Sequence, residues 1–109
     1  MASELLKVAL KAACSNSETK LIDGASGHNY TILSITMCET AGAAETFDLY
    51  VDNDDGGTDF YIYKAQPLGA NQTFEHTGRI VLEATDMLGF ITANTANVDV
   101  VVSYLDQTL

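Results

Sequence analysis

The 109-residue sequence is poor in the residue types that most often carry chemistry or staple a small fold. It has no tryptophan, one proline, two histidines and two cysteines. Cys14 and Cys38 have neither a C-x-x-C spacing nor a nearby histidine, so the sequence gives no support for a zinc site. We interpret both as small buried hydrophobic residues, with a disulfide between them as the alternative.

Positive charge is also scarce. Five basic residues stand against 15 acidic ones, for a formal net charge of −10. The basic residues are scattered along the chain: Lys7, Lys11, Lys20, Lys64 and Arg79. A nucleic-acid surface needs clustered lysine and arginine, so we predict no binding to nucleic acid and none to an anionic membrane surface. The negative charge favours solubility or a basic partner.

Long hydrophobic runs are missing as well. No segment approaches the ~20 apolar residues of a membrane-spanning helix. The opening "MASELLKVALKAACS" is interrupted by Lys7 and Lys11, so it lacks the continuous apolar core of a secretory signal. We therefore predict no membrane association.

What the sequence does contain is a series of short alternating segments, with 47% hydrophobic residues overall. The stretches between them are short and rich in glycine, asparagine, aspartate and threonine, which favour turns. This pattern predicts a single all-β domain over residues 1–109, an antiparallel β-sandwich or barrel. The expected strands are 29–38, 46–51, 59–64, 73–76, 79–83, 87–93 and 98–105.

Alternation also predicts which side chains face the core, because successive residues of a strand point to opposite faces. In segment 29–38 the expected core row is Thr31, Leu33, Ile35 and Met37. In segment 46–51, Tyr50 lies opposite the row formed by Phe47, Leu49 and Val51.

The N-terminal segment 1–15 fits two patterns. Its apolar residues can be placed on one helical face, or can alternate as in a strand, and either element is too short to be stable alone. We favour an extended arm or a first strand. We expect it to contact a partner, and a strand that completes the sandwich is the alternative. The candidate contact residues are Leu5, Leu6, Val8 and Leu10.

The aspartate-rich stretch Asp52–Asp59 has two interpretations. A 12-residue calcium loop starting at Asp52 would place Gly56 at the fifth position and Tyr63 at the twelfth, and neither supplies the expected side-chain ligand. The Asp-Gly and Gly-Gly pairs instead favour a tight hairpin, since glycine readily adopts positive φ. We predict a hairpin turn without a metal ion.

Catalytic residues are not evident. Asp54 and Asp55 are expected to be solvated at a loop tip, and Ser26 near His28 does not form a nucleophile motif. We predict no enzymatic activity and no cofactor. The tyrosines Tyr50, Tyr61 and Tyr63 have two open interpretations: an exposed aromatic face for recognition, or cross-strand packing within a sheet.

The order of these segments resembles a family of small structural proteins in tailed bacteriophage particles. The matching pieces are "LKAACSNSETKLID", the strand region "YTILSITMCETAGAAETFDLYV", and the run from "TDFYIYKAQPLGANQTFEH" to "VDVVVSYLD". Together they span about Lys11 to Asp106. The sequence departs from the family where "IDGASGHN" stands in place of a V-P-x-G turn.

This resemblance implies a jelly-roll-like β-sandwich of about seven to eight strands that builds virions. The implied role is a capsid decoration (cement) protein, which associates with itself, with a trimer favoured, and docks on the major capsid protein or another virion protein. A collar or tail component is the nearest alternative. The implied location is the particle surface, after a soluble stage in the host cytoplasm. An unrelated alternative is a carbohydrate- or receptor-binding module that uses the three tyrosines.

Overall fold

The computed structural model describes residues 3–53 and 56–109, which form nine strands and no helix. No helix that could span a membrane is therefore present in these ranges. The strands are β1 (Ser3–Cys14), β2 (Thr19–Asp23), β3 (His28–Glu39), β4 (Glu45–Asp52), β5 (Asp59–Leu68), β6 (Thr73–His76), β7 (Ile80–Leu82), β8 (Met87–Thr92) and β9 (Val98–Thr108).

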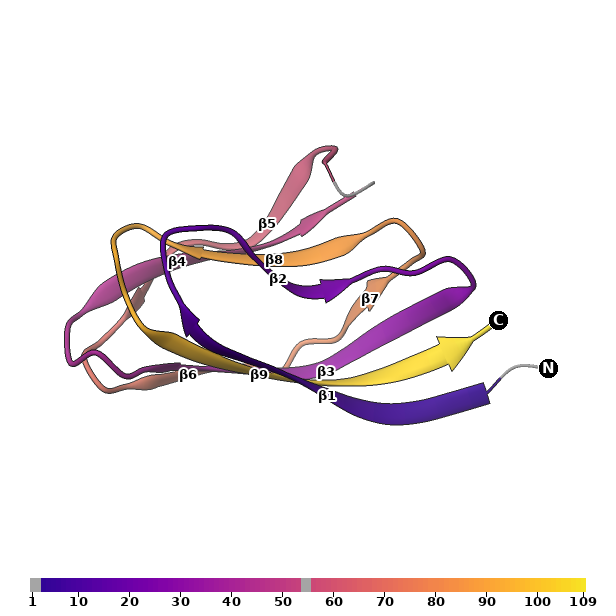
Figure 1. Ribbon diagram of the computed structural model, residues 1–109, viewed down its shortest axis with the longest axis horizontal. Helices are drawn as coiled ribbons and strands as arrows, with labels where there is room; N and C mark the ends of the chain where they lie inside the picture. Colours follow the sequence, from indigo (N-terminus) through magenta and orange to yellow (C-terminus); the bar gives the residue numbers. More distant parts are fainter. Residues whose placement is uncertain (1–2, 54–55) are drawn as a thin grey trace.

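The strands form two antiparallel sheets that pack face to face (Figure 1). Sheet A has the order β1-β9-β3-β6, with β7 also paired to β3, and sheet B has the order β2-β8-β4-β5. Consecutive strands pass repeatedly from one sheet to the other, as in a jelly roll. The predicted all-β, jelly-roll-like sandwich is thus confirmed.

All seven strands expected from alternation are present, and the N-terminal segment forms an eighth, β1. The ninth strand, β2, was not predicted from the sequence, because its five residues show little alternation. β6 pairs with the later half of β3 and β7 with its first half, so these two strands lie end to end and occupy one strand position.

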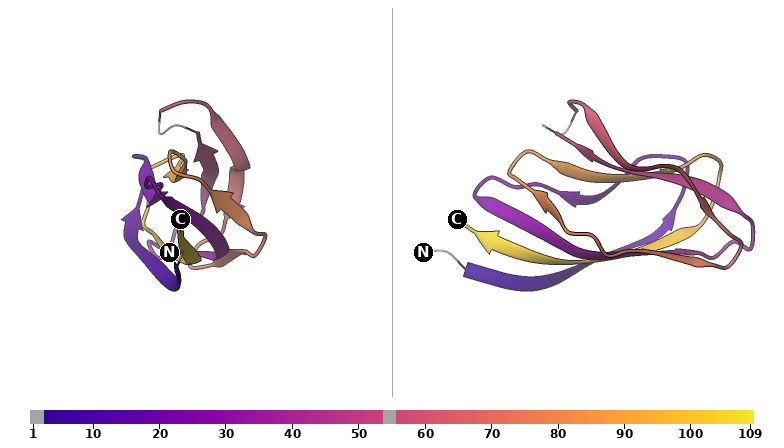
Figure 2. Two further views of the ribbon diagram at one scale, coloured as in Figure 1. Left: turned by 90° about the vertical axis from the view of Figure 1, so that its right-hand side faces the viewer. Right: turned by 180° about the vertical axis from the view of Figure 1, so that it is seen from behind.

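The sandwich is elongated, with extents of 47 × 27 × 20 Å. The start of β1 and the end of β9 lie at the same end of the molecule. At this end β1, β9 and the start of β3 extend together beyond β2, as the view from behind in Figure 2 also shows. The first half of β1 is therefore not covered by β2.

An aromatic cluster joins the two sheets. Phe47 and Phe90 of sheet B stack with ring centroids 5.3 Å apart, and Phe47 meets Phe74 of sheet A edge to face at 5.5 Å. Tyr63 closes the cluster at 5.0 Å from Phe74. Phe47 and Phe90 are completely buried, so their contacts hold the sheets together at the centre of the core.

The core face of β3 was predicted correctly only in its second half. Ile35 and Met37 are fully buried as expected, but Ile32 is buried in place of Leu33. The pairing of β3 with β9 shifts register between Ile32 and Ser34. The extra residue of such a bulge reverses the alternation of side chains, which strict periodicity cannot anticipate.

A buried carboxylate organises two loops at the end of β3. Glu39 is only 1% exposed, and its two oxygens accept backbone N–H bonds from Ala41, Gly42, Ala43 and Asn71 at 2.8–3.1 Å. Burial alone would raise the pKa of this carboxyl, but the N–H donors outweigh it and hold the pKa below its ordinary value. Glu39 therefore links the loop after β3 to the loop before β6.

Candidate interface on the outer face and free edge of β1

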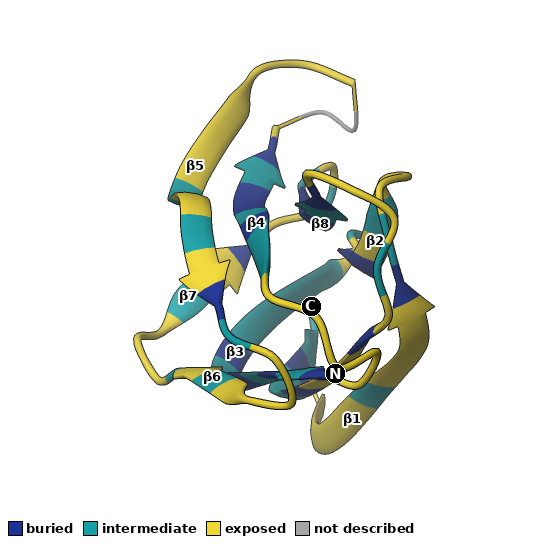
Figure 3. Cartoon of the chain, turned by 90° about the vertical axis from the view of Figure 1, so that its left-hand side faces the viewer, coloured by how far each residue is buried: buried dark blue, intermediate teal, exposed yellow. Residues whose placement is uncertain are grey.

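The N-terminal segment forms the edge strand of sheet A. Residues Ser3–Lys11 pair in continuous register with β9, and the described residues include no strand on the other side of β1. Only Ala9 and Cys14 of this strand pack against the core. The four predicted contact residues are all exposed, by 55% (Leu5), 78% (Leu6), 54% (Val8) and 69% (Leu10). Figure 3 shows β1 and β5 as largely exposed strands at opposite edges of the sandwich.

The outer face of sheet A is apolar where β1 and β9 meet. Directly opposite residues of an antiparallel pair share a face. Leu6 pairs with Leu105, Val8 with Ser103 and Leu10 with Val101. We call this surface the apolar face; its hydrophobic members are Leu6, Val8, Leu10, Leu33, Val101 and Leu105.

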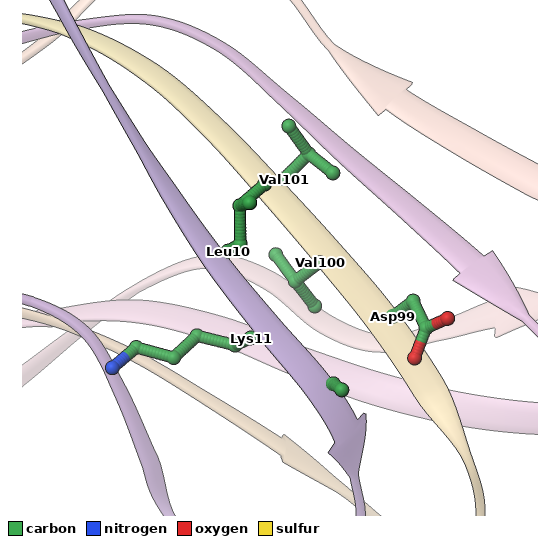
Figure 4. A pocket seen from close by; sticks show the side chains of 6 residues that line it. Leu10, Lys11, Asp99, Val100 and Val101 are labelled. Carbon is green, nitrogen blue, oxygen red and sulfur yellow. The ribbon is translucent and has the colours of Figure 1, made fainter.

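Two shallow hollows mark the apolar face. One, of about 250 Å³, is lined by Leu10, Lys11 and Val101 among others, and Figure 4 shows Leu10 and Val101 side by side across the two strands. The other, of about 400 Å³, is lined by residues that include Leu6 and Leu33. Soluble monomers rarely expose large contiguous apolar patches, so this surface is the strongest candidate for a contact with another macromolecule.

A charged cluster fixes β1 to the body of sheet A. Asp106 on β9 is 3% exposed, and its two carboxylate oxygens lie 2.8 Å from the Lys7 ammonium nitrogen and 2.7 Å from His28 Nδ1. Hydrogen bonds from Lys7 and His28 lower the pKa of the Asp106 carboxyl, and the same bond to Asp106 raises the pKa of Lys7. Three strands are thereby joined at the end of the molecule where β1 is least covered.

Removing this charge should weaken the fold in a pH-dependent way. We expect Asp106→Asn to lower the urea midpoint at pH 7, because the neutral amide cannot form an ion pair with the Lys7 ammonium. The lowered pKa means that the stabilisation by Asp106 is present above the ordinary value of 3.8 and is lost as pH falls through the folded-state value. The difference between variant and wild type should therefore shrink below about pH 4.

The control for this measurement is Glu75→Gln, which changes an exposed carboxylate on β6. Its midpoint at pH 7 should stay close to that of the wild type. A difference between Asp106→Asn and wild type that is the same at pH 7 and pH 3 would contradict the assignment.

The three tyrosines do not form one exposed aromatic face. Tyr50 is only 3% exposed, and its hydroxyl bonds to the Glu18 carboxylate. Its ring covers Gly89, where an added Cβ would lie 2.4 Å from the ring. Burial and Glu18 raise the pKa of the Tyr50 hydroxyl. Tyr50 as a surface contact residue is therefore a wrong prediction.

Packing also accounts for Tyr63, whereas Tyr61 is accessible. Tyr63 belongs to the aromatic cluster, and its hydroxyl lies 2.8 Å from His76 Nδ1. Tyr61 is 48% exposed, with the Lys64 ammonium 4.4 Å from its ring centroid. One of the three predicted tyrosines is therefore available on the surface.

The predicted hairpin between the tyrosine-rich strands is present. β4 and β5 pair antiparallel from Asp52 opposite Asp59, and the Asp52 carboxylate accepts N–H bonds from Gly56 and Gly57. Gly56 has a φ of 125°, which favours glycine. Two of the loop's aspartates, 54 and 55, lie outside the described residues, and the absence of a bound cation stays a prediction.

Metal and thiol chemistry have little support in the described part of the chain. It contains no group of three histidine, cysteine, aspartate or glutamate side chains that could hold a metal ion. Cys14 and Cys38 are free thiols. Burial raises the pKa of the Cys14 thiol, which disfavours its reactive thiolate form.

Comparison with solved structures shows the same fold in proteins of low sequence similarity. A chain of the disulfide-linked pili that form Bacillus endospore appendages aligns with a TM-score of 0.58 and 10% identity, over 99% of this chain and 88% of its own. A chain of the acidic stable capsid of a Helicobacter pylori bacteriophage aligns with a TM-score of 0.55 and 16% identity, over 100% and 94%. No protein-family model and no curated protein matches the sequence.

The residues that hold β1 in place were not identified from the sequence. Asp106 lies 99 positions from Lys7 and 78 from His28, so no local motif could connect them. The available signal was an aspartate inside an apolar strand, "VVVSYLDQ", since a buried carboxylate requires a partner.

Proposed function

We propose that the chain is a structural component of a tailed bacteriophage virion, acting as a capsid decoration (cement) protein. The observation that carries this proposal is the apolar face, which lies on the surface of a complete jelly roll and next to a free strand edge. The sequence resemblance to phage structural proteins supports the proposal. The fold shared with a phage capsid chain is compatible with it.

In this role the protein would stabilise the capsid shell by burying contact area on it. The apolar face would dock on the major capsid protein or another virion protein, so that each copy bridges neighbouring shell subunits. The buried area would oppose the outward pressure of packaged DNA. The proposal includes no catalytic step and no cofactor, and a collar or tail component would use the same surfaces.

The test is whether the protein is found on particles and binds them through this face. Antibody against the purified protein should label phage particles released by the organism that carries the gene. Particles stripped of the protein should rebind the wild type but not the Leu6→Lys, Leu10→Lys double variant. Phe60→Lys, at an exposed position on β5 at the opposite edge, is the matched control and should rebind.

Particles that never carry the protein would overturn the proposal. Equal rebinding by the double variant would show that the apolar face is not the docking surface. For the carbohydrate-binding alternative, Tyr50 is not accessible to a ligand, whereas Tyr61 and Phe60 are exposed. A glycan array on the purified protein separates the two functions, because a cement protein should show no sugar preference.

A further inference from the structure

We propose that two copies of this chain pair antiparallel through the free edges of β1, about a two-fold axis, so that their two A sheets become one continuous sheet. This inference rests on the proposed function, because it specifies how the assembly component associates with itself. It assigns Val8 to the position on the two-fold axis.

The free edge of β1 is the longest regular edge of the sandwich. An edge strand presents unpaired backbone N–H and C=O groups that form a template for another strand. β1 pairs with β9 without interruption from Ser3 to Lys11, contains no proline, and its irregularity begins only after Lys11. Both lysines of β1 are opposite inward-facing residues of β9, and Lys7 is bound by Asp106.

The other edges are less suitable for pairing. β5 contains Pro67, and Ala65 has a φ of 51°, which interrupts a regular strand. β2 has five residues, and β6 and β7 have four and three. Short edges, proline, irregular backbone and charged side chains are means by which proteins protect edges from pairing. Before Lys11, β1 has none of the first three, and the charge of its Lys7 is paired with Asp106 of the same chain.

A second copy is the occupant that fits this edge because β1 is complementary to itself. A two-fold axis perpendicular to a sheet keeps the same face outward in both copies, so each residue can only face a residue of its own face. With Val8 on the axis, Leu6 faces Leu10 of the partner subunit and Leu10 faces Leu6 of the partner subunit. The most exposed apolar side chains of the strand then cover one another.

Neighbouring registers are less favourable. Centring the pair on Lys7 would place two ammonium groups opposite each other, and centring it on Ala9 would place Lys7 opposite Lys11 of the partner subunit. Like charges directly opposite are destabilising. Centring on Leu6 would place Glu4 opposite Val8 of the partner subunit. The Val8 register avoids all of these pairs.

The Val8 register also agrees with the charge distribution. The chain has a net charge of −10, yet between Ser3 and Lys11 β1 carries two lysines against one glutamate. In this register Lys7 faces Ala9 of the partner subunit and Lys11 faces Leu5 of the partner subunit, so no two charged side chains of the β1 strands stand directly opposite each other.

Pairing would make the two apolar faces continuous on one side of the joined sheet. Val101 and Leu105 of each copy would lie beside the paired β1 strands, on the same side as the hollow in Figure 4. A dimer of this kind presents apolar residues of both copies to a shell on one side. It also restricts the closed oligomer to an even number of chains.

The test is a cysteine placed on the axis. Directly opposite residues of antiparallel strands have Cα atoms about 4.5–5.5 Å apart, within the range that a disulfide spans. Under mild oxidation Val8→Cys should run mainly as a covalent dimer, at twice 11.7 kDa, on a non-reducing gel. Leu10→Cys is the matched control. In the proposed dimer the two Leu10 positions are offset by four residues, about 13 Å along the strand, so Leu10→Cys should not cross-link and should run as a monomer on the gel.

Both variants keep Cys14 and Cys38, so the native thiols contribute equally. Wild-type protein should have the native mass of a dimer or a larger even oligomer by light scattering. Equal cross-linking of the two variants, or a wild-type monomer or trimer, would overturn the two-fold pairing. Particle labelling without such a dimer would leave the proposed function standing, whereas a dimer that never labels particles would overturn the function alone.

Discussion

Replacing Phe47 by alanine should lower the free energy of unfolding by roughly 3–5 kcal/mol. Phe47 is 1% exposed and lies at the centre of the aromatic cluster, where it meets Phe74, Phe90 and Tyr63. The change removes buried apolar area and leaves a cavity between the two sheets. Because hydrogen bonds hold the backbone of each sheet, the sheets cannot move together to fill the cavity. Domains of this size have a free energy of unfolding of only about 5–15 kcal/mol, so the expected loss is a large part of it.

Urea denaturation followed by circular dichroism measures this effect. Phe60→Ala is the matched control, because it removes the same ring from a 57% exposed position on β5. Its effect should stay within about 0.5 kcal/mol. Equal losses for the two variants would contradict the assignment of Phe47 to the junction of the sheets.

Deleting residues 1–10 should leave a folded domain that no longer associates. The deletion removes the first eight of the twelve residues of β1, but within its described part only Ala9 packs against the core. β9 would become the edge of sheet A and keep its pairing with β3. Asp106 would lose Lys7 and retain His28, so the domain should be less stable than the wild type.

Light scattering should show a shift from dimer to monomer for the truncated chain, and stripped particles should not rebind it. The triple variant Leu6→Ser, Val8→Ser, Leu10→Ser is the control, because it keeps the backbone edge and removes the apolar side chains. It should remain folded and fail to bind particles. A truncated chain that unfolds would show that the segment belongs to the core.

The parts of this fold that depend on local pattern could be predicted from the sequence. The alternation in "TFDLYV" and "DFYIYK", separated by Asp-Gly and Gly-Gly, indicated a hairpin, because these preferences act within a few residues. The exposed apolar residues of β1 were selected as contact candidates because a short amphipathic segment must pack against something. Neither prediction depends on which residues from other parts of the sequence lie close by in the fold.

The side-chain orientation of individual strands could not be predicted in the same way. A register shift between Ile32 and Ser34 moved Leu33 out of the core row of β3. A bulge is a response to the neighbouring strand, and its position is not written in the strand's own periodicity. The same applies to the site around Tyr50, which depends on the absence of a side chain at Gly89.

The sequence by itself determined that this protein is an acidic all-β domain with regular turns and an apolar N-terminal segment, since composition and short-range periodicity carry that information. Only the tertiary structure decided that the segment is an edge strand, that Asp106 joins it to Lys7 and His28, and that its apolar side chains form one face with those of β9. The physical reason is that a jelly roll pairs its first strand with its last, so the contacts that define this surface join opposite ends of the chain.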